Sequence, residues 1–298
     1  MKSNSSFRWL TPLAVAGALL FWASAFPGVR VGLKHFSPGH LALARYLIAS
    51  LALGIWALGT RSRLPPRRDW PQVALLGLLG FTIYNVAFNY GETRVSSGTA
   101  SFIINTSPIY ALLWARLWLG EEISRRAWLG IVVGFLGVAL LALGEGGWQF
   151  NPYALILIIS ALAGSGYIVL QKSLLARCDS MGLITASVWF GTLFLMVFAP
   201  GLASELKQAP AAALWGLVYL GVFPGAASYA LWAYALSSLP VTRMVSFLYL
   251  IPPLATLLAW VWLGEVPPSL SLLGGAVALS GVIWANAAKR KDALLVVE

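Results

Sequence analysis

The stretch Leu117-Trp118-Leu119-Gly120-Glu121 returns later in the chain as Val261-Trp262-Leu263-Gly264-Glu265. The two copies lie 144 residues apart, and each directly follows a long apolar segment. Nearer the start the spacing shortens, since residues 26–30 match residues 168–172 at a distance of 142. The chain therefore contains an internal repeat. Between about residue 75 and residue 142 the repeat needs no gap, and its matched pairs include Gly77 with Gly221, Tyr90 with Tyr234, Pro108 with Pro252, Gly130 with Gly274 and Gly137 with Gly281.

The composition around this repeat is that of a membrane protein. Of the 298 residues, 59% are hydrophobic and only 10% are charged, whereas soluble domains carry about 25% charged residues. Apolar segments of helix length recur along the whole chain, and a helix of about 20 residues crosses a bilayer. This excludes a soluble enzyme, a nucleic-acid-binding protein and a secreted disulfide scaffold. The single cysteine, Cys178, has no partner for an internal disulfide.

Ten apolar segments alternate with short, charged connections. Each segment is predicted to be a helix, because lipid offers backbone groups no hydrogen bonds. We expect an all-α membrane protein with ten transmembrane helices, arranged as two five-helix repeats over residues 9–143 and 152–287. The predicted spans are 9–29, 38–59, 72–91, 97–118, 126–143, 152–173, 181–199, 211–235, 241–263 and 269–287.

The odd number of spans in each repeat fixes how the two copies are related. After five spans the chain has changed sides, so the second copy must enter the membrane from the opposite face. The repeats are therefore inverted about a two-fold axis in the membrane plane. This is the architecture of alternating-access transporters, whose substrate lies near mid-membrane between the two halves. We expect a central cavity there.

Lysine and arginine residues predict the orientation. Fourteen of them lie at the start, at the end or in connections on the side of the termini, and four lie on the other side. Because basic residues accumulate in cytoplasmic loops, both termini are predicted to be cytoplasmic. The fourteen are Lys2, Arg8, Arg61, Arg63, Arg67, Arg68, Arg116, Arg125, Arg126, Lys172, Arg177, Lys289, Arg290 and Lys291, and the four are Arg30, Lys34, Arg94 and Lys207.

Two five-helix units, each with Leu-Gly-Glu after its fourth span and spaced glycines in its fifth, resemble the EamA-type units of the drug/metabolite transporter superfamily. The resemblance covers residues 9–287, and it is greatest to bacterial exporters of the YddG type, which export aromatic amino acids. It implies a single chain with ten helices and a central cavity, located in a bacterial inner membrane, that exports amino acids and related metabolites by alternating access. One chain holds both repeats, so a functional monomer is expected, with the lipid bilayer and a small-molecule substrate as its partners.

Polar side chains follow one face of the third predicted span and one face of the fourth. Amides that face lipid would lack hydrogen-bond partners, so these faces must contact protein or a hydrated cavity. They either join neighbouring helices or line the cavity, and their alignment on two adjacent helices favours the cavity. The residues are Thr82, Asn85, Asn89 and Glu92 in the third span, and Ser97, Ser101, Asn105 and Pro108 in the fourth.

The equivalent positions in the second repeat carry aromatic side chains. Asn85 corresponds to Tyr229 and Asn105 to Tyr249, while Trp232 corresponds to Phe88. If the halves face each other, the cavity has one hydrogen-bonding wall and one aromatic wall, which suits an amino acid with an apolar or aromatic side chain. Aromatic residues in membranes also pack or form interfacial belts, so a purely structural role stays open for each of them.

Arg45 lies about two turns into the second span. An arginine facing lipid at a helix centre costs roughly 2.5–3.5 kcal/mol on the insertion scale, so Arg45 is expected to face the cavity or a protein partner. There it holds either a substrate carboxylate or, structurally, backbone carbonyls or Glu92. The complete set of candidate substrate-binding residues is Trp22, Arg45, Thr82, Asn85, Asn89, Ser101, Asn105, Tyr167, Tyr229, Trp232 and Tyr249.

The sequence offers no catalytic residues, metal site or cofactor site. The only histidines are His35 and His40, no Cys/His cluster exists and no phosphate-binding loop is present. Ala163-Gly164-Ser165-Gly166 resembles a nucleophile turn, but no histidine lies at a matching depth, and its small residues are better explained by close helix packing.

Three alternatives to an amino-acid exporter remain at this point. A sugar-phosphate or nucleotide-sugar carrier would need several convergent cations, and the spans contain Arg45 and little else. An intramembrane enzyme would need a nucleophile beside a base, and none is evident. A channel would need a filter motif, and the two halves differ where a filter would require symmetry.

Energy coupling can also be inferred. Proton-driven carriers place an ionisable group inside the membrane, whereas all ten acidic residues here fall at span ends, in connections or in the tail. Glu92, at the outer end of the third span, comes nearest to the cavity. We therefore expect facilitated diffusion or exchange.

The topology can be tested with reporters fused after residue 298. Because of the bias of fourteen basic residues to four and the even number of spans, a reporter that is active only in the cytoplasm should be active. The repeat also requires the first span, despite Ala23-Ser24-Ala25 resembling a signal-peptidase site, to remain attached. Activity confined to a periplasm-dependent reporter would contradict the predicted orientation.

Overall fold

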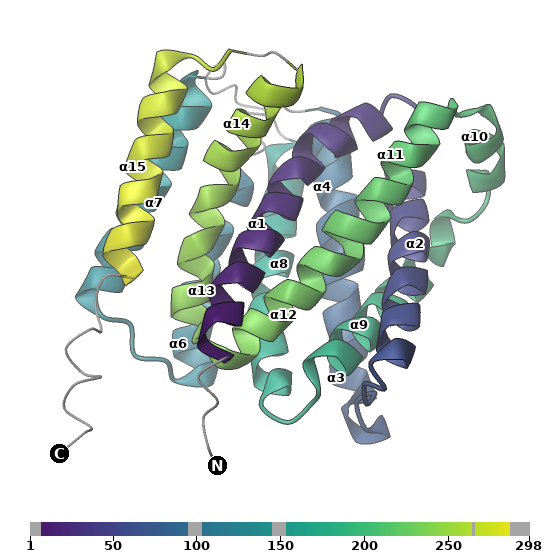
Figure 1. Ribbon diagram of the computed structural model, residues 1–298, viewed down its shortest axis with the longest axis horizontal. Coiled ribbons are helices and arrows are strands. Elements are labelled where there is room, and N and C mark those ends of the chain that lie inside the picture. The colour runs from purple at the N-terminus through teal and green to yellow at the C-terminus, as the bar shows by residue number, and fades with distance from the viewer. Residues whose placement is uncertain (1–6, 95–102, 145–152, 264–265, 287–298) are drawn as a thin grey trace.

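The structure is a computed structural model that describes residues 7–94, 103–144, 153–263 and 266–286. Within these ranges the chain is folded into helices and contains no strand (Figure 1). The predicted all-α fold is confirmed. The helices stand side by side and run from one face of the molecule to the other, as expected for a protein that must satisfy its backbone inside lipid.

The helices are as follows. Those of the first half are α1 Phe7–Gly32, α2 Pro38–Gly59, α3 Trp70–Gly77, α4 Tyr84–Glu92, α6 Ser107–Leu119 and α7 Arg125–Gly144. Those of the second half are α8 Ala154–Leu175, α9 Ser180–Leu195, α10 Leu202–Gln208, α11 Ala211–Val222, α12 Ser228–Ser238, α13 Val241–Phe247, α14 Ile251–Leu263 and α15 Ser269–Asn286. Short segments of other helix types join them, namely η1 Arg67–Asp69, η2 Leu78–Ile83, η3 Met196–Phe198, η4 Phe223–Ala227 and η5 Leu248–Leu250.

Nine candidate membrane spans occur among the residues that the structure describes. They coincide with nine of the ten predicted spans. The remaining predicted span, 97–118, begins outside the described residues, and its described helix α6 starts only at Ser107. The count of ten therefore stays a prediction, while the membrane-spanning character of the other nine agrees with their length and hydropathy.

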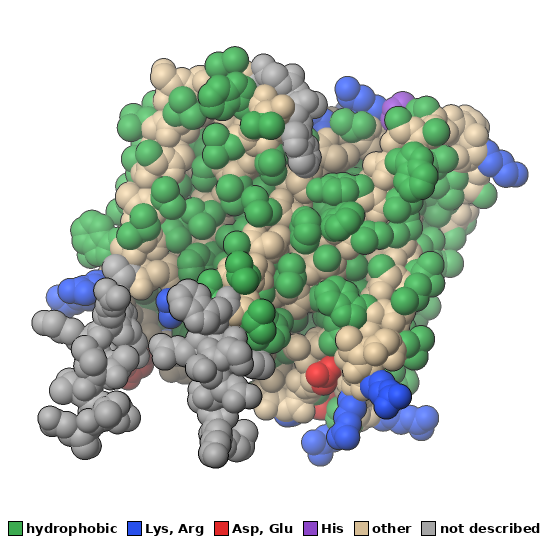
Figure 2. Space-filling model, viewed as in Figure 1, with side chains coloured by type: hydrophobic (Ala, Val, Ile, Leu, Met, Phe, Trp, Pro, Cys, Tyr) green, Lys and Arg blue, Asp and Glu red, His purple; other side chains and the backbone are tan. Residues whose placement is uncertain are grey.

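The outer surface is apolar over the middle of the molecule. Figure 2 shows hydrophobic side chains covering the visible sides of the helices, with basic side chains gathered at the two ends. Leu51, Leu58, Trp215 and Val261 are among the large hydrophobic side chains that lie exposed. A continuous apolar surface of this kind would be unstable in water and is typical of a protein surrounded by lipid.

The helix ends form two faces. We call the face with the start of α1 and the end of α15 the terminal face; it also carries the α6–α7, α8–α9 and α12–α13 connections (Figure 1). The opposite face carries the α1–α2 connection and α10. On the terminal face Arg177 Nη2 donates to Asp69 Oδ1 at 2.9 Å, which joins the α8–α9 connection to η1.

The opposite face has its own bridge between the halves. His40 Nδ1 lies 2.8 Å from Glu205 Oε1, and the backbone N–H of Ser37 donates to Glu205 Oε2 at 3.0 Å. Partial burial alone would raise the pKa of the Glu205 carboxyl, but the Ser37 N–H and the neighbouring His40 together hold that pKa below its usual value. α10 is thereby attached to the start of α2.

The helices of the two halves begin at equivalent places. α4 and α12, α6 and α14, and α7 and α15 each start 144 residues apart, and α2 and α9 start 142 apart. α2 and α9 also touch through equivalent residues, since the hydroxyls of Ser50 and Thr192 lie 2.7 Å apart and are separated by 142 positions. A residue that contacts its own repeat equivalent lies on the axis relating the copies.

α7 and α15 pack along glycines at backbone contact. A Cβ on Gly137 would lie 2.7 Å from the carbonyl oxygen of Gly274, and a Cβ on Gly281 would lie 2.7 Å from that of Gly130. Contact positions descend along α15 as they ascend along α7, so these equivalent helices are antiparallel. Gly274 is the repeat equivalent of Gly130 and Gly281 that of Gly137. The two contacts are therefore exchanged by a two-fold axis, as an inverted repeat requires.

Two π-helical segments, η2 and η4, interrupt the third and eighth predicted spans. They occupy equivalent positions in the two halves, between Gly77 and Tyr84 in the first and between Val222 and Ser228 in the second. A π-helical turn holds more residues than an α-helical turn and is common near functional sites. Both segments lie directly before the residues that face the centre of the molecule.

The glycine seam predicts a sharp position dependence of stability. Gly137→Ala would push a methyl group into the backbone of Ala278 and Gly274, and such overpacking costs about 1–3 kcal/mol. Thermal unfolding of the purified protein in detergent should therefore occur at a lower temperature. Gly216→Ala in α11 is the matched control, because nothing lies within 4 Å of its added methyl group. Equal unfolding temperatures for the two variants would contradict the packing described.

Candidate functional site

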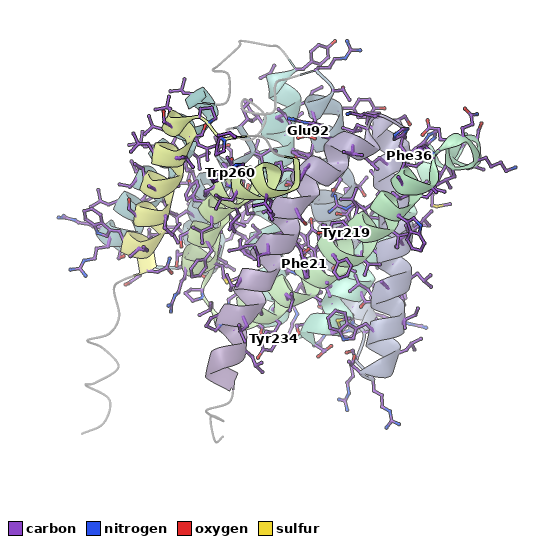
Figure 3. The ribbon with its side chains drawn as sticks, turned by 45° about the horizontal axis from the view of Figure 1, so that its top comes forward. Phe21, Phe36, Glu92, Tyr219, Tyr234 and Trp260 are labelled. Carbon is purple, nitrogen blue, oxygen red and sulfur yellow. The ribbon has the colours of Figure 1, made fainter. Side chains whose placement is uncertain are left out.

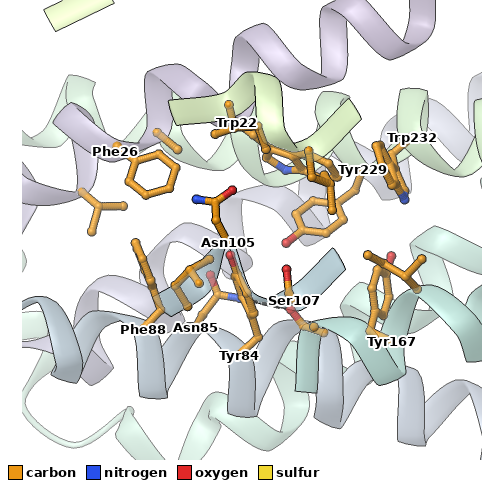
Figure 4. A pocket seen from close by; sticks show the side chains of 18 of the residues that line it. Trp22, Phe26, Tyr84, Asn85, Phe88, Asn105, Ser107, Tyr167, Tyr229 and Trp232 are labelled. Atoms are coloured by element: carbon orange, nitrogen blue, oxygen red, sulfur yellow. Dashed lines mark hydrogen bonds between the residues drawn. The ribbon is translucent and has the colours of Figure 1, made fainter. Parts of the chain in front are cut away.

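A cavity of about 110 Å³ lies near the centre of the molecule, between α1, α2, α4, α6, α8, α12 and the η5–α14 segment (Figure 4). Its walls come from both halves of the chain. The lining residues are Trp22, Ala25, Phe26, Val29, Arg45, Gly80, Tyr84, Asn85, Phe88, Ile104, Asn105, Ser107, Gly164, Tyr167, Ile168, Tyr229, Trp232, Leu248 and Ile251.

The lining follows the internal repeat. On α1 it uses positions 22, 25 and 26, and on α8 it uses 164, 167 and 168, which are the same positions displaced by 142. Positions 85, 88, 104 and 107 of the first half likewise have their equivalents 229, 232, 248 and 251 in the lining, at a displacement of 144. The cavity thus lies where equivalent surfaces of the two halves meet.

Arg45 supplies a buried positive charge to this cavity. Its side chain is only 6% exposed; its Nε donates to the carbonyl oxygen of Leu220 at 3.2 Å and its Nη1 to Asn85 Oδ1 at 3.5 Å. Asn85 is in turn oriented by donating to the carbonyl oxygens of Gly80 and Phe81. No carboxylate of the described residues lies within 4.0 Å of Arg45. An uncompensated guanidinium of this kind has capacity for a further acceptor.

Three aromatic rings form a compact cluster on another side of the cavity. The ring centroid of Trp22 lies 5.1 Å from that of Tyr229 and 5.0 Å from that of Trp232. Figure 4 shows the three side chains in its upper part, across from Tyr84 and Asn85. The indole Nε1 atoms of Trp22 and Trp232 have no hydrogen-bond partner among the described residues. This wall therefore combines apolar surface with buried donors.

The described lining contains no aspartate, glutamate or histidine. Glu92 is the last residue of α4, four residues beyond the lining residue Phe88, and is not part of the lining; Figure 3 shows it toward the opposite face. The described residues also contain no group of three potential metal ligands. Among the described lining residues the charge is therefore the single cation of Arg45.

Of the residues that the sequence indicated, seven line the cavity, three lie elsewhere, and Ser101 lies outside the described residues. Thr82 Oγ1 donates to the carbonyl oxygen of Gly191 in α9 at 3.1 Å, and Asn89 Nδ2 donates to that of Pro38 at 3.0 Å. Tyr249 is fully buried against Gly134 of α7. The seven are Trp22, Arg45, Asn85, Asn105, Tyr167, Tyr229 and Trp232.

The π-helical segment explains why the polar residues of the third span diverge. The alignment of Thr82 with Asn85 assumed a uniform 100° per residue, but residues 78–83 have i→i+5 geometry, which turns the following helix face. Thr82 consequently faces α9, whereas Asn85 faces the cavity. Asn89, one further turn along α4, reaches the backbone at the start of α2.

Several lining residues were missed by the sequence argument, above all Phe26, Tyr84, Phe88 and Ser107. The first half is therefore not purely polar, because Tyr84 and Phe88 add aromatic surface beside Asn85. A signal for Phe26 was present, since positions 22, 25, 26 and 29 of α1 follow the helical period of one face. That face is uniformly apolar, and an apolar helix face by itself is indistinguishable from one that contacts lipid.

The chain is similar to known transporters along most of its length. The model of the EamA-like transporter family matches residues 9–143 and again residues 151–287. The uncharacterized transporter YdfC of Bacillus subtilis is 40% identical over 88% of this chain and 86% of its own length. A protein of Streptantibioticus cattleyicolor named as a probable terminal-alkyne amino-acid exporter is 38% identical over 92% of both chains.

A solved crystal structure shares the fold. It covers 97% of this chain and 99% of its own, with a TM-score of 0.77 and 20% sequence identity. Since the family model matches both halves, and relatives of 40% and 38% identity extend along most of the chain, this chain belongs to the EamA-like transporter family and is a membrane transporter.

Proposed function

We propose that this transporter exports amino acids, including aromatic or apolar ones, by alternating access. The observation that carries the proposal is a buried guanidinium, Arg45, which is the single cation of the described lining in a cavity that also has an aromatic wall. The 38% identical relative named as an amino-acid exporter supports the same class of substrate.

Each part of an amino acid has a complementary group in the cavity. The α-carboxylate would bind Arg45, whose remaining N–H groups can form charge-assisted hydrogen bonds. The ammonium would be bound by neutral oxygen atoms and by aromatic faces, since the described lining offers Ser107, Asn105 and Tyr229 and no carboxylate. An apolar or aromatic side chain would contact Trp22 and Trp232.

The cavity is less suited to the two alternative functions, a sugar-phosphate or nucleotide-sugar carrier and an intramembrane enzyme. A sugar phosphate or nucleotide sugar carries two negative charges, and Arg45 is the single cation in the described lining. An intramembrane enzyme would need an acid–base partner beside its nucleophile, and the described lining offers Ser107 without a histidine or carboxylate. Both remain distinguishable by experiment.

The relation between the halves supports alternating access. Residues 9–143 and 152–287 would act as two inverted units that rock about the axis near Ser50 and Thr192, exposing the cavity to one side at a time. We place the protein in a bacterial inner membrane with both termini cytoplasmic, acting as a monomer. Counterflow of a panel of labelled amino acids into proteoliposomes tests the substrate class directly.

Arg45→Gln should raise the apparent KM for the transported amino acid by at least about tenfold, because it removes a charge-assisted hydrogen bond to the carboxylate. The amine that lacks only the carboxylate should be transported equally by both proteins. Arg45→Lys retains the charge and should fall between them. Wild-type affinity for the amino acid in Arg45→Gln would exclude the carboxylate role.

Substitutions of the two walls should lower transport without loss of the folded protein. Asn85→Leu removes the acceptor that orients Arg45, and Trp232→Ala removes aromatic contact area. Both should reduce uptake in counterflow while the protein remains monodisperse in detergent. Cysteines at 85 and 232 that stay unreactive toward a small hydrophilic thiol reagent in every transport state would indicate that these positions are only packed.

Net movement should follow the substrate gradient and not a proton gradient, because the described lining has no carboxylate or histidine to carry a proton. Proteoliposomes loaded with equal substrate on both sides should show no accumulation when a pH gradient is imposed. Accumulation that disappears in Glu92→Gln would establish proton coupling and refute this prediction.

A further inference from the structure

At the turn between α12 and α13, the backbone groups at the helix ends need hydrogen-bond partners that the turn itself does not supply. α12 ends at Ser238 and α13 begins at Val241, with Leu239 and Pro240 between them. The last carbonyls of one helix and the first N–H groups of the next need outside partners. Pro240 precedes α13 and offers no side-chain cap to it. The partners come instead from two charged residues on other helices.

Lys172 binds the carbonyl end. It lies in the last turn of α8, and its Nζ donates to the carbonyl oxygens of Leu236 and Leu239, at 2.8 Å each. The C-terminal end of a helix carries a partial negative charge. The ammonium of Lys172 therefore complements the end of α12 both in hydrogen bonding and in charge.

Glu121 binds the N–H end. Its two carboxylate oxygens accept from the backbone N–H groups of Val241 and Thr242, at 2.9 and 3.0 Å. Glu121 directly follows Gly120, which ends α6 in the left-handed conformation with a φ of 64°. The N-terminal end of a helix carries a partial positive charge, so the carboxylate complements the start of α13. The glutamate of the first Leu-Gly-Glu motif thus joins the first half of the chain to the second.

We call Glu121, Lys172 and their four hydrogen bonds the turn clamp. Glu121 and Lys172 are not themselves an ion pair within 4.0 Å among the described residues. Each charge binds one helix end, and the sign that each end accepts is fixed by the direction of the helix. The arrangement therefore depends on which residue carries which charge.

The turn clamp lies one helical turn from the cavity. Lys172 is four residues beyond Ile168 on α8, and Leu236 is four residues beyond Trp232 on α12, a rise of about 6 Å in each case. Ile168 and Trp232 both line the cavity. The clamp therefore holds α6, α8 and the α12–α13 turn together at the terminal-face end of the cavity.

We propose that Glu121 and Lys172 are positioning residues for transport, which close the cavity toward the terminal face and release the α12–α13 turn when that side opens. This inference rests on the proposed alternating-access function. Release leaves no charge buried without a partner, because opening exposes both side chains and both helix ends to water, which satisfies them. A clamp between charges and helix ends can therefore form and break within a transport cycle.

Two spin labels on the terminal face test whether the turn clamp controls opening of the cavity. One label is placed by Arg126→Cys at the start of α7 and the other by Ser237→Cys near the α12–α13 turn; both residues are exposed. The Cys178→Ser substitution removes the single native cysteine. The distance between the two labels should be short when the cavity is closed toward the terminal face and long when it is open. Pulsed electron paramagnetic resonance in nanodiscs without substrate should give mainly the short distance. Glu121→Gln or Lys172→Met should raise the ratio of the long to the short distance on the order of tenfold, the effect of losing a charge-assisted hydrogen bond.

Control variants separate the clamp from simpler roles. Glu122→Gln alters an exposed neighbouring carboxylate and should leave the distances unchanged, and Lys172→Arg should retain the short distance. The exchanged variant Glu121→Lys with Lys172→Glu should not restore it, because each charge would meet the wrong helix end. Restoration by the exchange would identify a plain ion pair and overturn the proposal.

A merely structural role is distinguished as well. If Glu121→Gln and Lys172→Met lower the unfolding temperature but leave the distance distribution unchanged, the clamp does not control opening. Because the distances are measured without substrate, they do not depend on which compound is transported. Failure of every amino acid in counterflow together with the expected shift in distance would refute the proposed function and retain the clamp.

Discussion

The absence of hydrogen-bonding partners in lipid is the constraint on which the rest of this structure depends. It forces the backbone of each span into helices and confines polar side chains to helix contacts and the cavity. Thr82 and Asn89 satisfy it by donating to backbone carbonyls of neighbouring helices. Arg45 satisfies it with Leu220 and Asn85, and the ends of α12 and α13 satisfy it with Lys172 and Glu121. The polar chemistry of the protein is concentrated where helices meet for this reason.

Close packing of the two halves places that chemistry at the centre. Glycines bring α7 and α15 into backbone contact, and Ser50 meets its equivalent Thr192 where α2 and α9 cross. The cavity lies between these symmetric contacts and is lined by equivalent positions whose residues differ. Asn85 faces its repeat equivalent Tyr229 across the cavity. Two identical residues at these positions would make both walls chemically alike. Divergence between the copies therefore gives the cavity its amphiphilic character.

Much of this architecture could be predicted from the sequence. The span 38–59 coincides with α2, and the span 269–287 begins where α15 begins, because hydropathy and flanking proline or charge mark the ends of a membrane helix. Arg45, Asn85 and Trp232 were predictable because polar or large aromatic residues inside a span need a protein environment.

The direction in which the Thr82 side chain points could not be predicted, since a π-helical turn leaves no signature in the residue pattern. Tyr249 and Phe26 could not be assigned either, because an aromatic side chain contacts lipid, protein or a cavity with similar ease. The contact of Glu121 with α13 depends on long-range packing, and the motif alone gave only its position after α6.

The paired π-helical segments belong to the repeat unit and not to one half alone. A π-helical turn arises when one residue is added to an α-helix, and an addition in one copy alone would change the spacing of the repeat at that point. The spacing is 144 residues both before η2, at Gly77 and Gly221, and after it, at Tyr90 and Tyr234. Both copies therefore carry the same number of residues through the segment. The irregular turn beside the cavity is therefore a property of the repeat unit, which the chain contains twice.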